Sequence, residues 1–184
     1  MDKRLRCDEL KSKVMSAKEA AKLFEDNMVV GTSGFTPAGY PKAVPLALAD
    51  RVKNGENIGI TLITGASVGP ELDGALSELG IIKRRYPYQT NSSCRNSINN
   101  SSINYSDMHL SHTPQWVKYG FFGNMDIALV EAVAITEEGY IIPSTSIGNS
   151  NVFVECADKV IIEINTSQPM DLEGMHDIYN LEAP

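Results

Sequence analysis

The chain has 184 residues, of which 42% are hydrophobic, so it is long enough for one well-cored domain and too short for two large ones. Its formal net charge is −7, with 16 basic residues scattered among 23 acids, which argues against nucleic acid and favours a small-molecule ligand. The charged start and the lack of an apolar run of about 18 residues predict neither a signal peptide nor a membrane span, so we expect a cytoplasmic protein. Cys7, Cys94 and Cys156 lack CxxC spacing, which indicates reduced thiols with structural roles.

The first predicted element is a helix over residues 16–26. Ser16 followed by Glu19 has the spacing of a capping box, and apolar residues then recur at i, i+3, i+4 and i+7. Residues 28–31 form a short, apolar and β-branched stretch, and they are bounded by a glycine-containing loop. This pattern predicts a short buried strand.

A glycine-containing loop, residues 32–40, leads into a second predicted helix. Pro41 suits the first helical position, and an apolar stripe follows it until Asn54-Gly55. The unit then repeats, because residues 57–64 read as a strand and Pro70 opens another amphipathic helix. The first half therefore alternates strands with helices.

Two further strands are predicted in the second half of the chain. Residues 126–136 are almost continuously apolar, as expected for a strand buried on both faces of a parallel sheet, and residues 159–165 are similar. Residues 137–139, Glu-Glu-Gly, indicate a hairpin turn before "YIIPS". The fold class is therefore α/β, with an open, largely parallel sheet flanked by helices.

Residues 91–106 are rich in Ser and Asn. Because this stretch is short and contains apolar residues that can pack, we interpret it as a polar surface loop within the domain and not as a linker. Thr113 and Pro114 then suit the cap and the first residue of a helix.

The loop in "VVGTSGFTPAGYPKAVP" lacks the signatures of nucleotide-binding loops. Gly34 to Gly39 is followed by Tyr40 and Pro41 and not by the Lys-Ser/Thr of a P-loop, and GxGxxG is absent. Backbone N–H groups before a helix N-terminus can still hold an anion, including a carboxylate. A purely structural tight turn explains the pattern equally well.

Four other segments share this polar or glycine-bearing character. They are residues 64–71, 87–90, 109–112 and 146–150, and most of them follow predicted strands. Ligands of open α/β sheets bind outside the carboxyl ends of the strands. If these loops converge, they form a site rich in neutral hydrogen-bond donors and poor in charge.

Several reactive residue types have more than one interpretation. His109 and His112 are three residues apart, but no carboxylate or cysteine cluster supports a zinc site, and a structural role is favoured. Glu131 lies within an apolar strand and is either a nucleophile or, as we favour, a carboxylate anchored by a neighbouring loop. Ser33 and Ser67 lack the GxSxG setting of a nucleophile elbow.

An ordered series of motifs resembles a known family. The chain resembles the N-terminal half of the acetyl-CoA hydrolase/transferase family, most closely its succinyl-CoA:acetate CoA-transferases, over residues 15–179. The motifs that carry the resemblance are "SGFTPAGYPKAVP", "LITGASVGPELDG", "RRYPYQT", "DMHLSH", "YGFFGNMDIALVEAVAIT", "GNSNVFVECADKVIIEIN" and "LEGMHDIY".

The resemblance implies the three-layer αβα arrangement of the CoA-transferase fold and the chemistry of a class I CoA-transferase. In that chemistry CoA moves between an acyl-CoA and a carboxylate through a glutamyl-CoA thioester. No cofactor is implied, because acyl-CoA is itself the substrate. The glutamate belongs to a second domain that this chain does not match, so residues 1–184 are expected to form a single N-terminal domain.

The resemblance also implies substrate-binding residues, while no residue of this chain is expected to be catalytic or to bind metal. Ser67 and the backbone of residues 34–39 are the strongest candidates, and Glu131 is expected to be a local anchor. The full set is Gly34, Phe35, Thr36, Pro37, Ala38, Gly39, Ser67, Gln89, Thr90, His109, Ser111, Gly148 and Asn149.

Three functional hypotheses follow. The chain is an N-terminal CoA-transferase domain that is inactive alone, a half-enzyme that works with a separate C-terminal chain, or a non-catalytic module that binds carboxylates or CoA. Acetyl-CoA hydrolysis is a possible activity of the full-length enzyme, because water can attack the same intermediate. The expected partners are acyl-CoA, small carboxylates and the missing C-terminal domain, with a homo-oligomer for the full-length enzyme and no nucleic acid or membrane.

Overall fold

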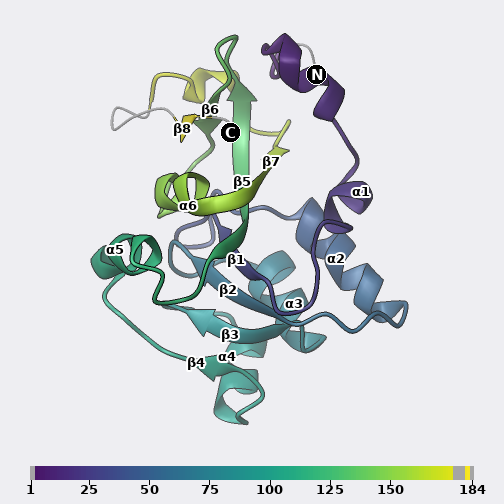
Figure 1. The fold of residues 1–184 in the computed structure, drawn as a ribbon, viewed down its shortest axis with the longest axis vertical. Helices are drawn as coiled ribbons and strands as arrows, with labels where there is room; N and C mark the ends of the chain where they lie inside the picture. The colour runs from purple at the N-terminus through teal and green to yellow at the C-terminus, as the bar shows by residue number, and fades with distance from the viewer. Residues whose placement is uncertain (1–2, 176–180, 183–184) are drawn as a thin grey trace.

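The structure is a computed structural model that describes residues 3–175 and 181–182. Its centre is an eight-stranded, mostly parallel sheet with the order β4-β3-β2-β1-β5-β6-β8, and β7 pairs with β5 (Figure 1). The strands are β1 Val29–Thr32, β2 Ile60–Thr64, β3 Ile82–Tyr86, β4 Asn104–Tyr105, β5 Met125–Ile135, β6 Tyr140–Pro143, β7 Ala157–Ile164 and β8 Leu181–Glu182.

Helices cover both faces of this sheet. The helical segments are η1 Asp8–Lys13, α1 Ala17–Ala21, α2 Ala43–Lys53, η2 Pro70–Gly74, α3 Ala75–Glu78, α4 Ser92–Asn99, η3 Leu110–His112, α5 Thr113–Lys118, α6 Ser150–Cys156 and η4 Met170–Leu172. None of the described helices has the length and apolar character that a bilayer crossing requires.

The alternation of side chains along the strands explains the two helical layers. Leu62 and Leu129 pack with α1, α2 and α3 on one face, in the larger hydrophobic core. Ile63 and Ala128 are the sequence neighbours of these two residues on β2 and β5. They face the opposite side of the sheet and pack with Phe153 of α6. The α/β class with a largely parallel sheet flanked by helices is therefore confirmed, and successive residues of a strand supply the two cores.

Strand β5 connects the parallel and antiparallel parts of the sheet. Its first part lies between β1 and β7 and is parallel to both, with Ala128 opposite Gly31 and Val160. Its last residues pair antiparallel with β6, across the turn predicted at residues 137–139. The predicted strand over 126–136 is confirmed with bounds one residue earlier, and the hairpin is confirmed as well; every residue of β5 except Asp126 is buried, as its apolar run predicts.

Several predicted boundaries are wrong. The capping box of Ser16 and Glu19 is present, but α1 ends at Ala21 and not at residue 26, because the chain then forms tighter i+3 turns. Helix α2 begins at Ala43 and not at Pro41.

The segment predicted as a polar surface loop contains a helix. Asn91 accepts a hydrogen bond from the Cys94 N–H and caps α4, Ser92–Asn99. Cys94 and Ile103 are buried, so the apolar residues of this stretch do pack against the core. The prediction was wrong because Ser and Asn have low intrinsic helix propensity, whereas a good cap and tertiary packing outweigh it here.

Candidate functional site

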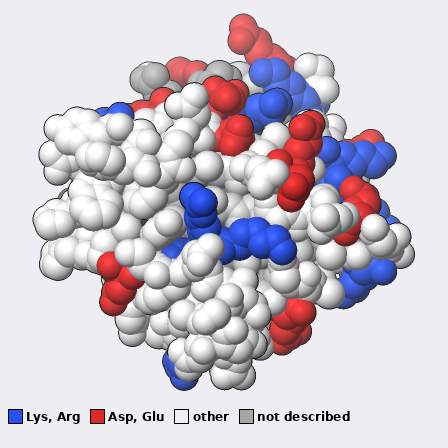
Figure 2. Space-filling view, turned by 60° about the horizontal axis from the view of Figure 1, so that its bottom comes forward, with Lys and Arg blue, Asp and Glu red and all other residues white. Residues whose placement is uncertain are grey.

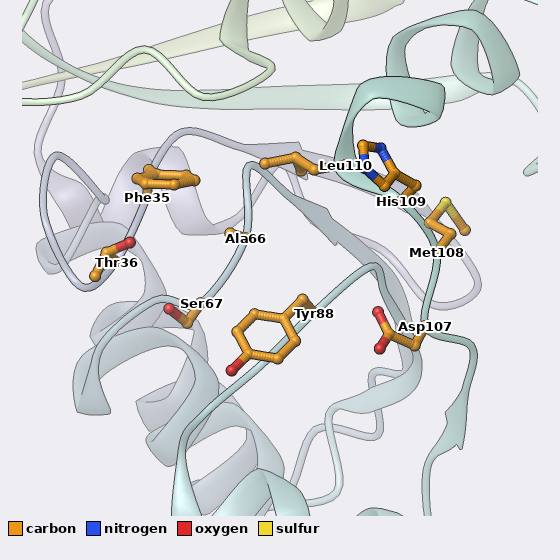
Figure 3. A pocket seen from close by; sticks show the side chains of 9 residues that line it. All are labelled: Phe35, Thr36, Ala66, Ser67, Tyr88, Asp107, Met108, His109 and Leu110. Atoms are coloured by element: carbon orange, nitrogen blue, oxygen red, sulfur yellow. The ribbon is translucent and has the colours of Figure 1, made fainter.

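A pocket of about 590 Å³ opens where the parallel strands β1, β2 and β3 end (Figure 3). It is lined by Phe35, Thr36, Ala66, Ser67, Tyr88, Asp107, Met108, His109 and Leu110. The hydroxyl-bearing Thr36 and Ser67 lie on one side of it, and Asp107, Met108 and His109 lie on the other (Figure 3). The predicted convergence of loops after successive strands is therefore present in the fold.

The loop after β1 is closed by its own hydrogen bonds. The Ser33 hydroxyl donates to the Gly39 carbonyl at 2.7 Å and accepts from the Glu131 N–H at 2.9 Å. Phe35 and Ala38 exchange backbone hydrogen bonds at 3.0 and 3.1 Å, which tightens the loop further. This rigid turn presents Phe35 and Thr36 to the pocket, while the other residues of the 34–39 loop do not line it.

The anion position at the N-terminus of α2 is filled by the chain itself. The Glu163 carboxylate of β7 accepts hydrogen bonds from the N–H groups of Lys42 at 2.7 Å, Ala43 at 3.0 Å and Val44 at 2.9 Å. A carboxylate is favoured there because the first N–H groups of a helix have no intrahelical partner and carry partial positive charge. The sequence left a bound anion and a purely structural turn equally open, and at this helix end the anion is the chain's own Glu163.

Glu131 is an anchor in the structure. Its side chain is 1% exposed, and it accepts from the Ser144 hydroxyl at 2.6 Å, the Lys42 ammonium at 2.6 Å and the Asn165 amide at 3.1 Å. These donors satisfy a buried carboxylate that would otherwise be costly. Glu131 is not among the residues that line the pocket.

A buried arginine holds two of the pocket loops together. Arg85 of β3 is fully buried and pairs with Asp73 through two hydrogen bonds, at 2.7 and 2.9 Å. Its Nη2 also donates to the carbonyls of Ala66 at 3.0 Å and Tyr88 at 3.4 Å. Burial lowers the pKa of Arg85, but the Asp73 carboxylate outweighs this effect and the pKa is raised. The guanidinium therefore stays charged and fixes both loops.

Sequence reasoning missed Arg85. Its only signal was a basic pair within "IIKRRY", and Arg84 beside it is exposed. The burial pattern of β3 is not a simple alternation, because the pairing of β2 with β3 shifts register between Ile60 and Thr61. A period-two reading that starts from the buried Ile82 would therefore place Arg84, and not Arg85, on the buried face.

The "PYQT" segment contributes a different residue from those predicted. Tyr88 lines the pocket, whereas Gln89 and Thr90 do not. The Thr90 carbonyl accepts from Arg95 at 3.1 Å, which attaches this loop to α4. The sequence signal that could have indicated Tyr88 was its place within "PYQT", from which only Gln89 and Thr90 were chosen.

The "DMHLSH" segment forms one side of the pocket. His109 lines the pocket, and the Ser111 hydroxyl, which does not line it, lies 2.7 Å from His109 Nδ1. The His109 and His112 rings pack with centroids 5.6 Å apart. Among the described residues no three His, Cys, Asp or Glu side chains are grouped closely enough to hold a metal.

Gly148 and Asn149 support the site from behind. A Cβ added to Gly65 would lie 2.5 Å from the Gly34 carbonyl oxygen and 2.8 Å from the Gly148 Cα. Three loops therefore meet through bare backbone. Asn149 is 6% exposed and, like Gly148, does not line the pocket.

The pocket lining carries no basic side chain and one acidic side chain. Asp107 is that acid, and sequence reasoning did not select it although it begins the "DMHLSH" motif. The remaining polar groups are the hydroxyls of Thr36, Ser67 and Tyr88 and the imidazole of His109. Such a lining offers mainly neutral hydrogen-bonding groups together with apolar surface.

Known proteins share both the sequence and the fold. The family described as "Acetyl-CoA hydrolase/transferase N-terminal domain" matches residues 1–181. Over 184 residues the chain is 55% identical to a succinyl-CoA:acetate CoA-transferase of Clostridium kluyveri, covering 100% of this chain and 34% of that protein. It is 42% identical over 177 residues to an acetyl-CoA hydrolase of Eremothecium gossypii, covering 91% of this chain and 34% of that one.

The fold is also found in a solved structure, RipA from Yersinia pestis. The TM-score is 0.66 at 20% identity, over 91% of this chain and 38% of that chain. The chain spans about a third of the length of the curated relatives named above. The match to residues 1–181 and the motifs of the pocket loops agree, and the chain belongs to the acetyl-CoA hydrolase/transferase family as its N-terminal domain.

Proposed function

We propose that this chain forms one wall of the active site of a CoA-transferase that moves CoA between acetyl-CoA or succinyl-CoA and a carboxylate. The observation that carries the proposal is the pocket formed by the loops after β1, β2 and β3, in a chain of this family. Its neutral donors and apolar side chains suit the acyl group and thioester of an acyl-CoA. The other wall is supplied by the region that makes the relatives longer.

The reaction passes through a glutamate of that other region. Its carboxylate attacks the thioester carbonyl, the carbon–sulfur bond breaks, and a mixed anhydride and CoA thiolate form. The thiolate then attacks the glutamyl carbonyl of the anhydride, which releases the first carboxylate and leaves a glutamyl-CoA thioester. The second carboxylate reverses these steps. Ser67 and nearby backbone N–H groups stabilise the oxyanions by hydrogen bonding.

The described residues support the assignment of the nucleophile to another region. Glu131 and Glu163 are engaged by intramolecular donors, and neither lines the pocket. Asp107 is the acid that lines it, and we assign it no covalent role. The chain is therefore expected to be inactive by itself, with the nucleophile-bearing region supplied either in the same polypeptide or by a separate subunit.

A chimera tests this function. In the chimera this chain replaces the matching region of the Clostridium kluyveri CoA-transferase, and both chimera and isolated chain are assayed with succinyl-CoA and acetate. Formation of acetyl-CoA by the chimera alone is the expected result. Turnover by the isolated chain would refute the assignment of the nucleophile, and micromolar acyl-CoA binding by the isolated chain in calorimetry would favour a binding module.

Hydrolysis is the second candidate, because a relative 42% identical over 177 residues is named an acetyl-CoA hydrolase. Water then replaces the second carboxylate as acceptor, and the same wall binds the acyl group. Thiol release from acetyl-CoA by the chimera, measured without any added carboxylate, distinguishes the two activities. A transferase passes CoA to the added carboxylate, so conversion of acetyl-CoA to succinyl-CoA on adding succinate, with little free thiol, identifies a transferase.

A further inference from the structure

An exposed group of aromatic side chains lies on α5 and the turn after it. Trp116, Tyr119 and Phe121 are 36%, 65% and 69% exposed. The Phe121 ring packs against Trp116 with centroids 5.8 Å apart and against Tyr119 at 6.1 Å. We call these three residues the aromatic cluster. Exposed aromatic residues that contact one another are typical of protein interfaces.

The backbone holds the aromatic cluster in a fixed arrangement. The Tyr119 N–H donates to the Gln115 carbonyl at 2.9 Å, and the Phe121 N–H donates to the Trp116 carbonyl at 3.1 Å. Gly120 follows with a φ of +71°, a conformation that favours glycine and turns the chain so that Phe121 folds back on the helix. A preorganised surface of this kind loses little side-chain entropy when a partner covers it.

The aromatic cluster is connected to the pocket wall. Trp116 also packs against Phe122 at 6.2 Å, and Phe122 packs against Tyr86 at 4.8 Å, two residues before the pocket residue Tyr88. Helix α5 itself follows the His109–Leu110 side of the pocket directly in sequence. The surface on the side where α5 lies, at the left of Figure 2, carries few charged side chains.

We propose that the aromatic cluster is the docking surface for the C-terminal region that completes the active site in longer members of this family. The inference rests on the proposed function, in which another region supplies the opposite wall. That region must approach the pocket, and the cluster is a rigid apolar surface at its edge. Because the relatives are about three times as long as this chain, a region large enough to cover it exists in them.

A lipid surface fits less well as the occupant. The chain has a formal net charge of −7, and the single basic residue of α5, Lys118, is paired with Glu155 at 2.7 Å. Peripheral membrane binding needs basic residues beside the apolar ones, because cellular membrane surfaces are negatively charged. The chemistry of the cluster therefore indicates a protein partner with a complementary apolar face.

Hydroxyl-radical footprinting tests the proposal without relying on activity. The isolated chain and the chimera with the Clostridium kluyveri region are oxidised under the same conditions, and modification of Trp116, Tyr119 and Phe121 is quantified by mass spectrometry. We expect all three to be modified in the isolated chain and protected at least about fivefold in the chimera, because docking removes them from water. Equal modification in the two proteins would overturn the proposal.

A double variant supplies the second measurement. Tyr119→Ser with Phe121→Ser in the chimera should bring the modification rate of Trp116 close to that of the isolated chain with the same two substitutions, since two contacts of the interface are removed and the comparison cancels the loss of Phe121 packing on Trp116. Both side chains are mostly exposed, so the domain itself should remain folded. Leu46→Ser on α2, where Leu46 is 41% exposed, is the matched control and should leave Trp116 protected. A protected Trp116 in the double variant would contradict the assignment of the docking surface.

Two further outcomes separate the alternatives. If the isolated chain at high concentration protects the cluster to the same degree, the occupant is a second copy and the proposal is wrong. A chimera that is active while its cluster stays exposed would retain the proposed function and remove the docking surface. A chimera with a protected cluster and no transfer activity would support the docking surface and contradict the proposed function.

Discussion

Glu131 and Glu163 are register partners on the parallel strands β5 and β7, and Lys42 binds both of them. Its backbone N–H donates to Glu163 at 2.7 Å, and its ammonium donates to Glu131 at 2.6 Å. Two neighbouring carboxylates would repel one another on adjacent strands. The segment that enters α2 removes this repulsion, and in return the two glutamates fix the loop that carries Phe35 and Thr36.

Replacing Lys42 with Met should destabilise the fold. The substitution leaves Glu131, which is 1% exposed, without its cation, and we expect the free energy of unfolding to fall by about 2–3 kcal/mol. The loss is smaller than for a fully buried pair because the Lys42 side chain is partly exposed. Urea unfolding at neutral pH measures it. Lys53→Met removes a surface pair with Asp50 and should cost less than about 1 kcal/mol. Equal losses in the two variants would show that Lys42 has no special role.

Replacing Glu163 with Gln should weaken the start of α2. The amide side chain keeps one accepting oxygen, but its NH2 group cannot accept the remaining N–H bond and the negative charge at the helix N-terminus is lost, so a cost of about 1–2 kcal/mol is expected. The loss should shrink in high salt. Glu25→Gln, at an exposed position, is the control and should have almost no effect on urea unfolding. An unchanged stability of the Glu163 variant would contradict the capping role.

Replacing Arg85 with Lys should destabilise the fold and loosen the pocket. Lysine cannot reproduce the two hydrogen bonds to Asp73 together with those to the Ala66 and Tyr88 carbonyls. Because lysine keeps the buried positive charge but leaves buried acceptors without donors, a loss of about 1–3 kcal/mol is expected in urea unfolding. Arg84→Lys changes the exposed neighbour on β3 and should be nearly neutral. The idea fails if the two variants behave alike.

Replacing Ser67 with Ala in the chimera should lower catalysis without unfolding the domain. The hydroxyl lies in the pocket at 3% residue exposure, and losing one neutral hydrogen bond to the reacting carbonyl corresponds to about a tenfold fall in kcat/KM. Ser92→Ala, at an exposed position of α4, is the control. Steady-state rates with succinyl-CoA and acetate measure the effect. Full activity in the Ser67 variant would show that its hydroxyl does not contribute to catalysis.

Replacing Asp107 with Asn in the chimera should favour anionic acceptors. The wild-type carboxylate repels an incoming carboxylate, so the variant should show a KM lower by roughly two- to fivefold, with a larger effect for succinate than for acetate. The difference should diminish in high salt. Asp158→Asn on β7 changes the net charge equally at an exposed position and is the control. Complete loss of transfer in the Asp107 variant would instead indicate a covalent or acid–base role.

Much of the fold could be predicted from local patterns. The continuous apolar run of β5, the hairpin to β6 and the capping box at Ser16 all follow from neighbouring residues, and all three are present. The α4 segment was assigned wrongly, because packing of Cys94 and Ile103 against a core distant in sequence outweighs its weak helix propensity. The start of α2 was predicted two residues too early for a related reason. The Glu163 carboxylate, which is distant in sequence, caps the first N–H groups of the helix.

The site divides in the same way. The sequence indicated the family and the loops, and of its proposed substrate-binding residues Phe35, Thr36, Ser67 and His109 line the pocket. Tertiary structure decided which members of each loop face the pocket, adding Tyr88 and Asp107 and placing Gly148 and Asn149 behind it. It also decided that the anion at α2 is Glu163 and that Arg85 joins two loops. Those contacts connect residues far apart in the chain, so their partners are set by the register and packing of the sheet and not by local sequence.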